Sequence, residues 1–107
     1  MASADRVLRH VVLIKFKENT PAADITHIED EFRSLAKVKI SQVKDYEWGT
    51  NISKENLNHG YTHSFLLTFA NEKDRDVYLE HQDHVAFVEI LKPHMDSATV
   101  IDYWANN

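Results

Sequence analysis

The sequence contains no cysteine among its 107 residues. This absence excludes a disulfide framework, a thiolate nucleophile and a thiolate-ligated metal centre. It also means that cysteine usage does not indicate a cellular compartment. Any catalytic or binding site in the chain must therefore use other side chains.

Positive charge is also scarce, since 12 Lys and Arg residues face 17 Asp and Glu residues and give a net charge of -5. A protein binds the phosphate backbone of a nucleic acid through a surplus of Lys and Arg. An anionic membrane surface attracts proteins through the same surplus. We therefore expect neither nucleic acid nor a membrane among the partners of this chain.

Long hydrophobic runs are missing as well. No stretch is long enough for the apolar region of a signal peptide or for a bilayer span, so we expect a cytoplasmic protein. Hydrophobic residues still make up 43% of the chain and charged residues 27%, which is enough to form a core with a polar surface. The length allows one domain, predicted over residues 9–104 after an N-terminal tail of residues 1–8.

Hydrophobic periodicity predicts four strands and two helical regions. The strands are expected at residues 10–16, 43–50, 62–69 and 98–104. The first helix is expected to begin at Thr20-Pro21, with Thr20 as N-cap, and to run to about Leu35. The second is expected to begin after Asn71 and to continue, after a cap at Asp83, toward Pro93.

This order is β-α-β-β-α-β, which predicts an α+β domain of the ferredoxin-like type. Two helical regions can cover only one face of a four-stranded sheet, and the other face would still expose apolar side chains. A large contiguous apolar patch is rare on a monomer. We therefore expect two sheets to pair in a homodimer, with assembly beyond the dimer left open.

Several strings occur in an order and spacing that resemble the stress-responsive A/B barrel (Dabb) domain family, over about residues 9–103. They are Arg9-His10-Val11-Val12-Leu13, Trp48-Gly49, Gly60-Tyr61-Thr62-His63, the segment from Tyr78 to Val85, and Val100-Ile101-Asp102-Tyr103. The resemblance implies a ferredoxin-like fold whose sheets pair into a dimeric α/β barrel. It does not by itself imply one activity, because the same fold carries many functions.

The resemblance also implies a site. In the cyclase-like members of the family, the positions matching Tyr78 and His84 form the working pair. The histidine acts as general base and the tyrosine orients or stabilises an enolate oxygen, with no cofactor. His10, His63 and Asp102 match cavity or supporting positions, and His81 and Trp48 complete the predicted lining of an apolar ligand cavity.

Two alternative interpretations of these histidines remain open at this stage. They can be buried polar groups with a structural role, for example a His10 that links two strands through Asp102. They can also hold a metal, because His81 and His84 have the spacing of one helix face. A zinc site needs three or four converging ligands, however, so we expect no metal.

Two departures from the cyclase pattern affect the functional prediction. The chain has Gln82-Asp83 where the family often has proline between the two histidines, and Leu35 lies near the place of a pocket tyrosine. We therefore expect a homodimer that binds a small hydrophobic molecule in a His- and Tyr-lined cavity. The alternatives are a cofactor-independent, polyketide cyclase-like lyase and, on weaker grounds, a dimeric-barrel monooxygenase or isomerase.

Overall fold

The computed structural model describes residues 6–107. Its four strands are β1 (Leu8–Phe16), β2 (Asp45–Thr50), β3 (His63–Phe69) and β4 (Met95–Trp104). They form one sheet in the order β2-β3-β1-β4, and every neighbouring pair is antiparallel. Of the predicted tail, residues 1–5 lie outside the described residues, and β1 already begins at Leu8.

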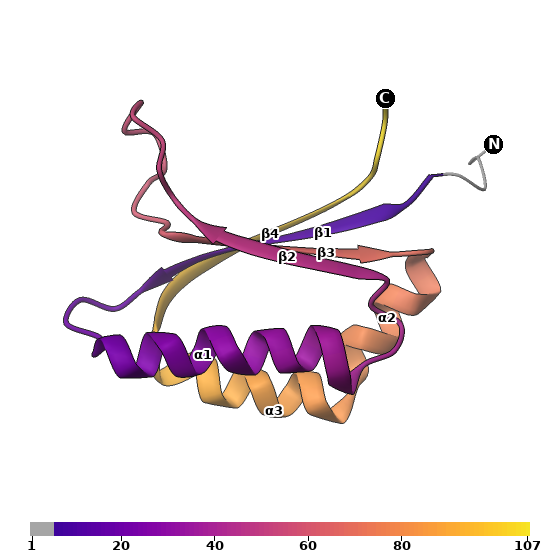
Figure 1. Cartoon of the computed structure of the whole chain (residues 1–107), viewed down its shortest axis with the longest axis horizontal. Helices are drawn as coiled ribbons and strands as arrows, with labels where there is room; N and C mark the ends of the chain where they lie inside the picture. The colour runs from indigo at the N-terminus through magenta and orange to yellow at the C-terminus, as the bar shows by residue number, and fades with distance from the viewer. Residues whose placement is uncertain (1–5) are drawn as a thin grey trace.

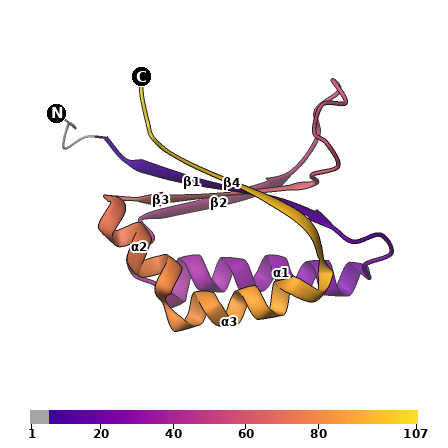
Figure 2. The ribbon, with the colours of Figure 1, turned by 180° about the vertical axis from the view of Figure 1, so that it is seen from behind.

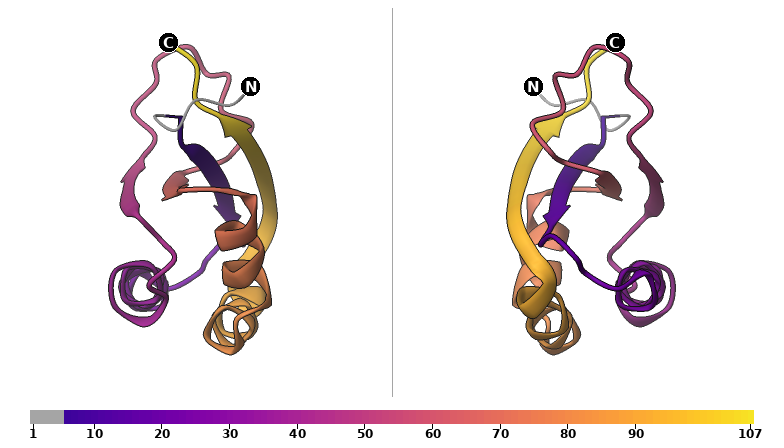
Figure 3. Two further views of the ribbon diagram at one scale, coloured as in Figure 1. Left: turned by 90° about the vertical axis from the view of Figure 1, so that its right-hand side faces the viewer. Right: turned by 90° about the vertical axis from the view of Figure 1, so that its left-hand side faces the viewer.

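The helices are α1 (Ala22–Ser34), α2 (Glu72–Glu80) and α3 (Gln82–Leu91). A π-helical turn at Leu35–Lys39 extends α1, and a 3₁₀ turn at Lys92–His94 follows α3. All three helices lie on one face of the sheet (Figures 1 and 2). The end-on views show α1 beside the α2–α3 pair beneath the twisted strands (Figure 3). The ferredoxin-like α+β prediction is confirmed.

The helix starts agree only in part with the predicted caps. Asn71 caps α2 as predicted, because its side chain accepts a hydrogen bond from the Asp74 backbone N–H at 2.8 Å. The prediction for Thr20 was wrong. Pro21 occupies the N-cap of α1, and the Thr20 hydroxyl instead donates to the Lys17 carbonyl at 2.6 Å.

The predicted cap at Asp83 was also wrong. His81 is the N-cap of α3, and its Nδ1 accepts a hydrogen bond from the Asp83 backbone N–H at 3.0 Å. The same residue ends α2, with extended backbone angles that turn the chain between the two helices. An imidazole nitrogen thus replaces the carboxylate expected from propensity.

Strand register places the helix-facing residues in rows across the sheet, and three of these rows contain the predicted site residues of the strands. One row contains Tyr46, Leu67, His10 and Asp102; the next contains Trp48, Phe65, Val12 and Val100; the third contains Thr50, His63, Ile14 and Ala98. The middle strands β1 and β3 supply the buried floor, and the helices supply the opposite wall through residues such as Phe32, Tyr78 and Phe87. Polar side chains in the same row can contact one another, whereas those two rows apart are too distant.

The opposite face of the sheet, here called the outer face, has no helix over it (Figures 1 and 2). Val11 lies in register between Leu66 of β3 and Ile101 of β4, so an apolar band crosses three strands. Ile101 is 55% exposed, and Tyr103 on the same face is also exposed. Within residues 6–107, no helix is long and apolar enough to cross a membrane.

Candidate functional site

A network of hydrogen bonds links β1, β4 and α2 at one end of the helix-facing side. The Nδ1–H of His10 on β1 donates to Asp102 on β4, with 2.6 Å between nitrogen and oxygen. Arg75 of α2 donates to the other carboxylate oxygen of Asp102 at 3.2 Å. His10 is 4% exposed. The hydrogen bond to Asp102 fixes the orientation of the His10 ring inside the core and leaves its Nε2 facing away from the carboxylate.

Tyr78 and His84 lie beside this hydrogen-bond network. The Tyr78 ring, only 1% exposed, has its centroid 5.8 Å from that of His10 and 4.6 Å from that of His84. Tyr78 comes from α2 and His84 from α3, so the turn at His81 brings them together. Four residues of the predicted site therefore form one group: His10, Asp102, Tyr78 and His84.

Hydrogen bonding determines which nitrogen of His84 is free. Its Nδ1 lies 3.0 Å from the Leu79 carbonyl oxygen. A carbonyl can only accept, so Nδ1 carries the proton, and in the neutral ring the lone pair is on Nε2. A base needs such a lone pair directed toward its substrate.

The protonation states of this pair suit acid–base chemistry. Burial lowers the pKa of His84, the Leu79 carbonyl opposes this change, and nearby His10 adds to the lowering. Burial raises the pKa of the Tyr78 hydroxyl, and Tyr46 adds to the rise. Near neutral pH the site therefore offers a neutral imidazole, which accepts a proton, beside a phenol, which donates a hydrogen bond.

The group lies next to an open part of the helix-facing side. Val100 of β4 belongs to the second row on this side, yet it is 54% exposed. Asp102, two residues further along β4, marks the border between this open edge and the buried group.

His63 belongs to a separate cluster. Its Nε2–H donates to Glu29 of α1 at 2.8 Å, and its Nδ1 lies 2.8 Å from the Thr62 hydroxyl. Its ring stacks parallel to Trp48, with 6.0 Å between centroids, and packs edge-on against Phe16. His63 lies two rows away from His10, which corresponds to about 14 Å along a strand.

Of the remaining predicted residues, His81 has its Nδ1 committed to capping α3. Among residues 6–107, no three His, Cys, Asp or Glu side chains converge in a way that could hold a metal ion. His81 and His84 each use Nδ1 for a contact within the chain.

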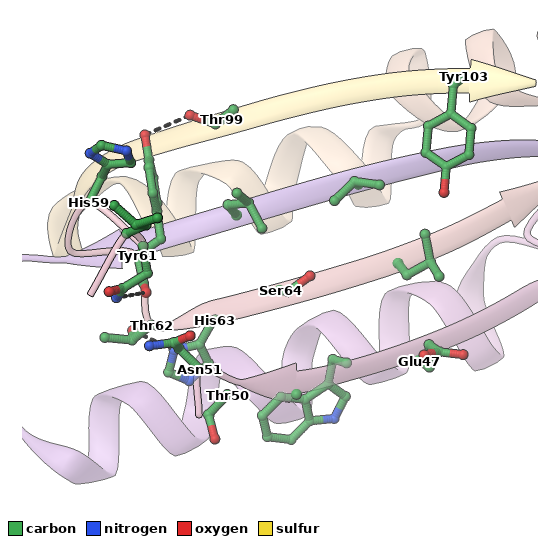
Figure 4. Close-up of a pocket in the computed structure, with 17 residues that line it drawn as sticks. Glu47, Thr50, Asn51, His59, Tyr61, Thr62, His63, Ser64, Thr99 and Tyr103 are labelled. Carbon is green, nitrogen blue, oxygen red and sulfur yellow. Dashed lines mark hydrogen bonds between the residues drawn. The ribbon is translucent and has the colours of Figure 1, made fainter. Parts of the chain in front are cut away.

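A concavity of about 780 Å³ lies on the outer face, between the sheet and the loop of residues 51–62 (Figure 4). Tyr61 spans one end of it, and its hydroxyl lies 2.6 Å from that of Thr99. Trp48 and His63 border this concavity. The other predicted residues do not, namely His10, His81, Asp102, Tyr78 and His84.

The sequence-based prediction did not single out two groups that are hydrogen-bonded to predicted site residues. Arg75 orients Asp102, and Glu29 holds His63. Tyr46 was not among the predicted site residues, although its place in the first row puts it on the helix-facing side with His10. The alternation of Tyr46 and Trp48 along β2 was the available signal, because a tyrosine on a buried face also buries a hydroxyl.

Comparison with known proteins identifies the family of this chain. The sequence profile of the stress responsive A/B barrel domain (Dabb) matches residues 8–105. Stress-response A/B barrel domain-containing protein HS1 of Arabidopsis thaliana is 34% identical over 96% of this chain and 94% of its own length. Olivetolic acid cyclase of Cannabis sativa is 26% identical over 90% of this chain and 94% of its own length.

Solved structures show the same fold. Hydroxynitrile lyase from Passiflora edulis superimposes with a TM-score of 0.87 at 22% identity, covering 94% of each chain. A dimeric ferredoxin-like protein of unknown function from Thermobifida fusca superimposes with a TM-score of 0.78 at 17% identity, covering 94% of this chain and 92% of its own. The profile match over nearly the whole chain, together with the fold, shows that this protein belongs to the stress-responsive A/B barrel domain family.

Proposed function

We propose that this protein is a homodimer in which each subunit binds a small hydrophobic molecule on the helix-facing side, against Tyr78 and His84. The observation that carries this proposal is the contact between these two rings, set in an apolar core and next to the oriented His10. Each imidazole uses Nδ1 within the chain, His10 toward Asp102 and His84 toward the Leu79 carbonyl, so each ring keeps Nε2 for a contact with a bound molecule.

The outer face supports the dimer. Val11, Leu66 and Ile101 form a band that no helix covers, and an exposed apolar band of this kind favours association. A second copy placed sheet to sheet would bury the band on both chains through a two-fold axis. The dimeric ferredoxin-like structure from Thermobifida fusca is a precedent for assembly of this fold.

A second candidate function is a cofactor-independent lyase or cyclase, and the free Nε2 of neutral His84 favours it. In such a reaction His84 takes the proton from a carbon next to a carbonyl group. The electron pair of the broken C–H bond moves onto the carbonyl oxygen as an enolate, and the Tyr78 hydroxyl donates a hydrogen bond to that oxygen. The similarity to a cyclase and a lyase motivates this candidate.

Binding and turnover can be tested with one set of variants. Wild type, His84→Ala, Tyr78→Phe and the control His59→Ala, an exposed loop position, are titrated with a linear β-polyketide thioester and then assayed for its cyclised product. We expect binding by wild type and by the control, and weaker binding by the two site variants. If the protein is also a cyclase, His84→Ala lowers the rate by a factor of about 10² to 10⁴.

The outcomes separate the two candidates. Binding without product in the wild type supports the ligand-binding function and rules out cyclisation of this substrate. Product formation that depends on His84, with folding unchanged by circular dichroism, supports the enzyme. Binding that is unaffected in both site variants contradicts the proposed site.

A further inference from the structure

The Tyr46 hydroxyl is a buried polar atom without a hydrogen-bond partner among residues 6–107. The residue is 9% exposed, so this hydroxyl lies inside the core. A phenylalanine would fill the same space without burying an unpaired donor. Such an atom in a folded protein needs an explanation, and one explanation is a partner that comes from outside the chain.

Strand register relates this hydroxyl to the site. Tyr46 on β2 is opposite Leu67 on β3, and Leu67 is opposite His10 on β1. Tyr46 and His10 are thus two strand spacings apart on the same side of the sheet, or about 10 Å between their backbones. Fully buried Leu67 forms an apolar floor between them.

The surroundings of Tyr46 are aromatic. Its ring centroid is 5.8 Å from that of Phe32, which in turn stacks on Phe65 at 4.4 Å and lies 4.7 Å from Phe87. Burial raises the pKa of Tyr46; Arg33 partly opposes this and Glu29 adds to it, so the group remains a protonated donor. Tyr46 also adds to the raised pKa of the Tyr78 hydroxyl, after burial as the main cause.

We infer that Tyr46 is a specificity-determining residue of the ligand site, whose hydroxyl donates a hydrogen bond to the carbonyl oxygen of an aromatic ketone. This inference rests on the proposed function and adds the ligand class. The donor hydroxyl selects an acceptor oxygen, and the rings of Phe32, Phe65 and Phe87 favour an aryl group next to it.

The test uses two probes that differ by one carbonyl group, hexanophenone and hexylbenzene. Their affinities are measured by calorimetry for wild type, Tyr46→Phe and Tyr61→Phe. Tyr61 is the matched control because it loses its hydroxyl at the outer-face concavity. We expect Tyr46→Phe to bind hexanophenone about five- to tenfold more weakly, the loss of one hydrogen bond, and to bind hexylbenzene unchanged. Tyr61→Phe is expected to match wild type with both probes.

Thermal unfolding of the ligand-free variant provides an independent readout. Because the hydroxyl has no partner in the described chain, Tyr46→Phe is expected to melt at the wild-type temperature or above it. A clear fall in melting temperature would mean that the hydroxyl already has a structural role and would overturn the inference.

The failures are distinguishable. Unchanged hexanophenone affinity in Tyr46→Phe overturns the inference and leaves the proposed function intact. If wild type binds neither probe, both are overturned for this ligand class. If Tyr61→Phe weakens binding while Tyr46→Phe does not, the ligand occupies the outer face, which overturns the helix-facing site and the inference with it.

Discussion

Replacing Ile101 by aspartate tests the assembly through the outer face. Ile101 is 55% exposed in the single chain, so a carboxylate at this position remains hydrated in the monomer and costs its fold little. In the sheet-to-sheet dimer the same carboxylate is removed from water opposite another apolar surface, without a partner cation. The substitution therefore separates association from folding.

The magnitude follows from symmetry. Loss of the apolar contact and desolvation of the carboxylate together cost about 2–4 kcal/mol per chain. A two-fold interface contains the substitution twice, so the dimer is weakened by about 4–8 kcal/mol. At about 1.4 kcal/mol for each factor of ten, the dissociation constant rises by roughly 10³ to 10⁶.

Light scattering coupled to size exclusion, repeated over a concentration series, measures the effect. Val38→Asp is the matched control, because Val38 is an aliphatic residue that is 79% exposed on the π-helical turn, away from the outer face. We expect a dimer for wild type and for the control, and a folded monomer for Ile101→Asp. A wild type that is monomeric at micromolar concentration, or an Ile101→Asp variant with undiminished dimer mass, would refute the reasoning.

Two further predictions concern stability. Glu29→Gln replaces the carboxylate that accepts the His63 hydrogen bond by a neutral amide, so urea unfolding should show a loss of about 1–2 kcal/mol; no loss would mean that this pair is not structural. The lowered pKa of His84 means that the unfolded chain takes up a proton near pH 6.5 before the folded chain does. Wild type should therefore lose stability as the pH falls below about 6.5, and His84→Gln should show a flatter profile over that window. An identical profile in the variant would argue against the burial of His84.

The order of strands and helices was predictable because it depends on local patterns. Alternating side chains with β-branched and aromatic residues predicted β3. Apolar residues at three- to four-residue spacing predicted α1, namely Ile25, Ile28, Phe32 and Leu35. Strand ends were less predictable: β4 begins at Met95, three residues before the expected start. Its early residues pair with β1 across a register shift at Lys15 and Phe16, which local composition does not reveal.

Part of the site was predictable and part was not. The segment from Tyr78 to His84 is short, so a turn between two helices was enough to bring the two side chains together. The separation of His63 from His10 depends on strand register, since both residues lie on the same face but two rows apart. The cap formed by His81 depends on the backbone angles of that one residue. The lack of a hydrogen-bond partner for the Tyr46 hydroxyl depends on the positions of all the surrounding side chains.

The two faces of the sheet place opposite demands on a ligand. The outer-face concavity is continuous with residues that the proposed dimer covers, so a molecule bound there would compete with the second subunit and lose affinity as protein concentration rises. A molecule bound beside Tyr78 and His84 meets the sheet from the helix side and leaves the band of Val11, Leu66 and Ile101 free. Ligand binding and association can then proceed together, with helices α2 and α3 shaping the site while the outer face holds the subunits. Under the proposed function, Tyr78 and His84 therefore lie on the side of the sheet where a partner subunit does not displace the ligand.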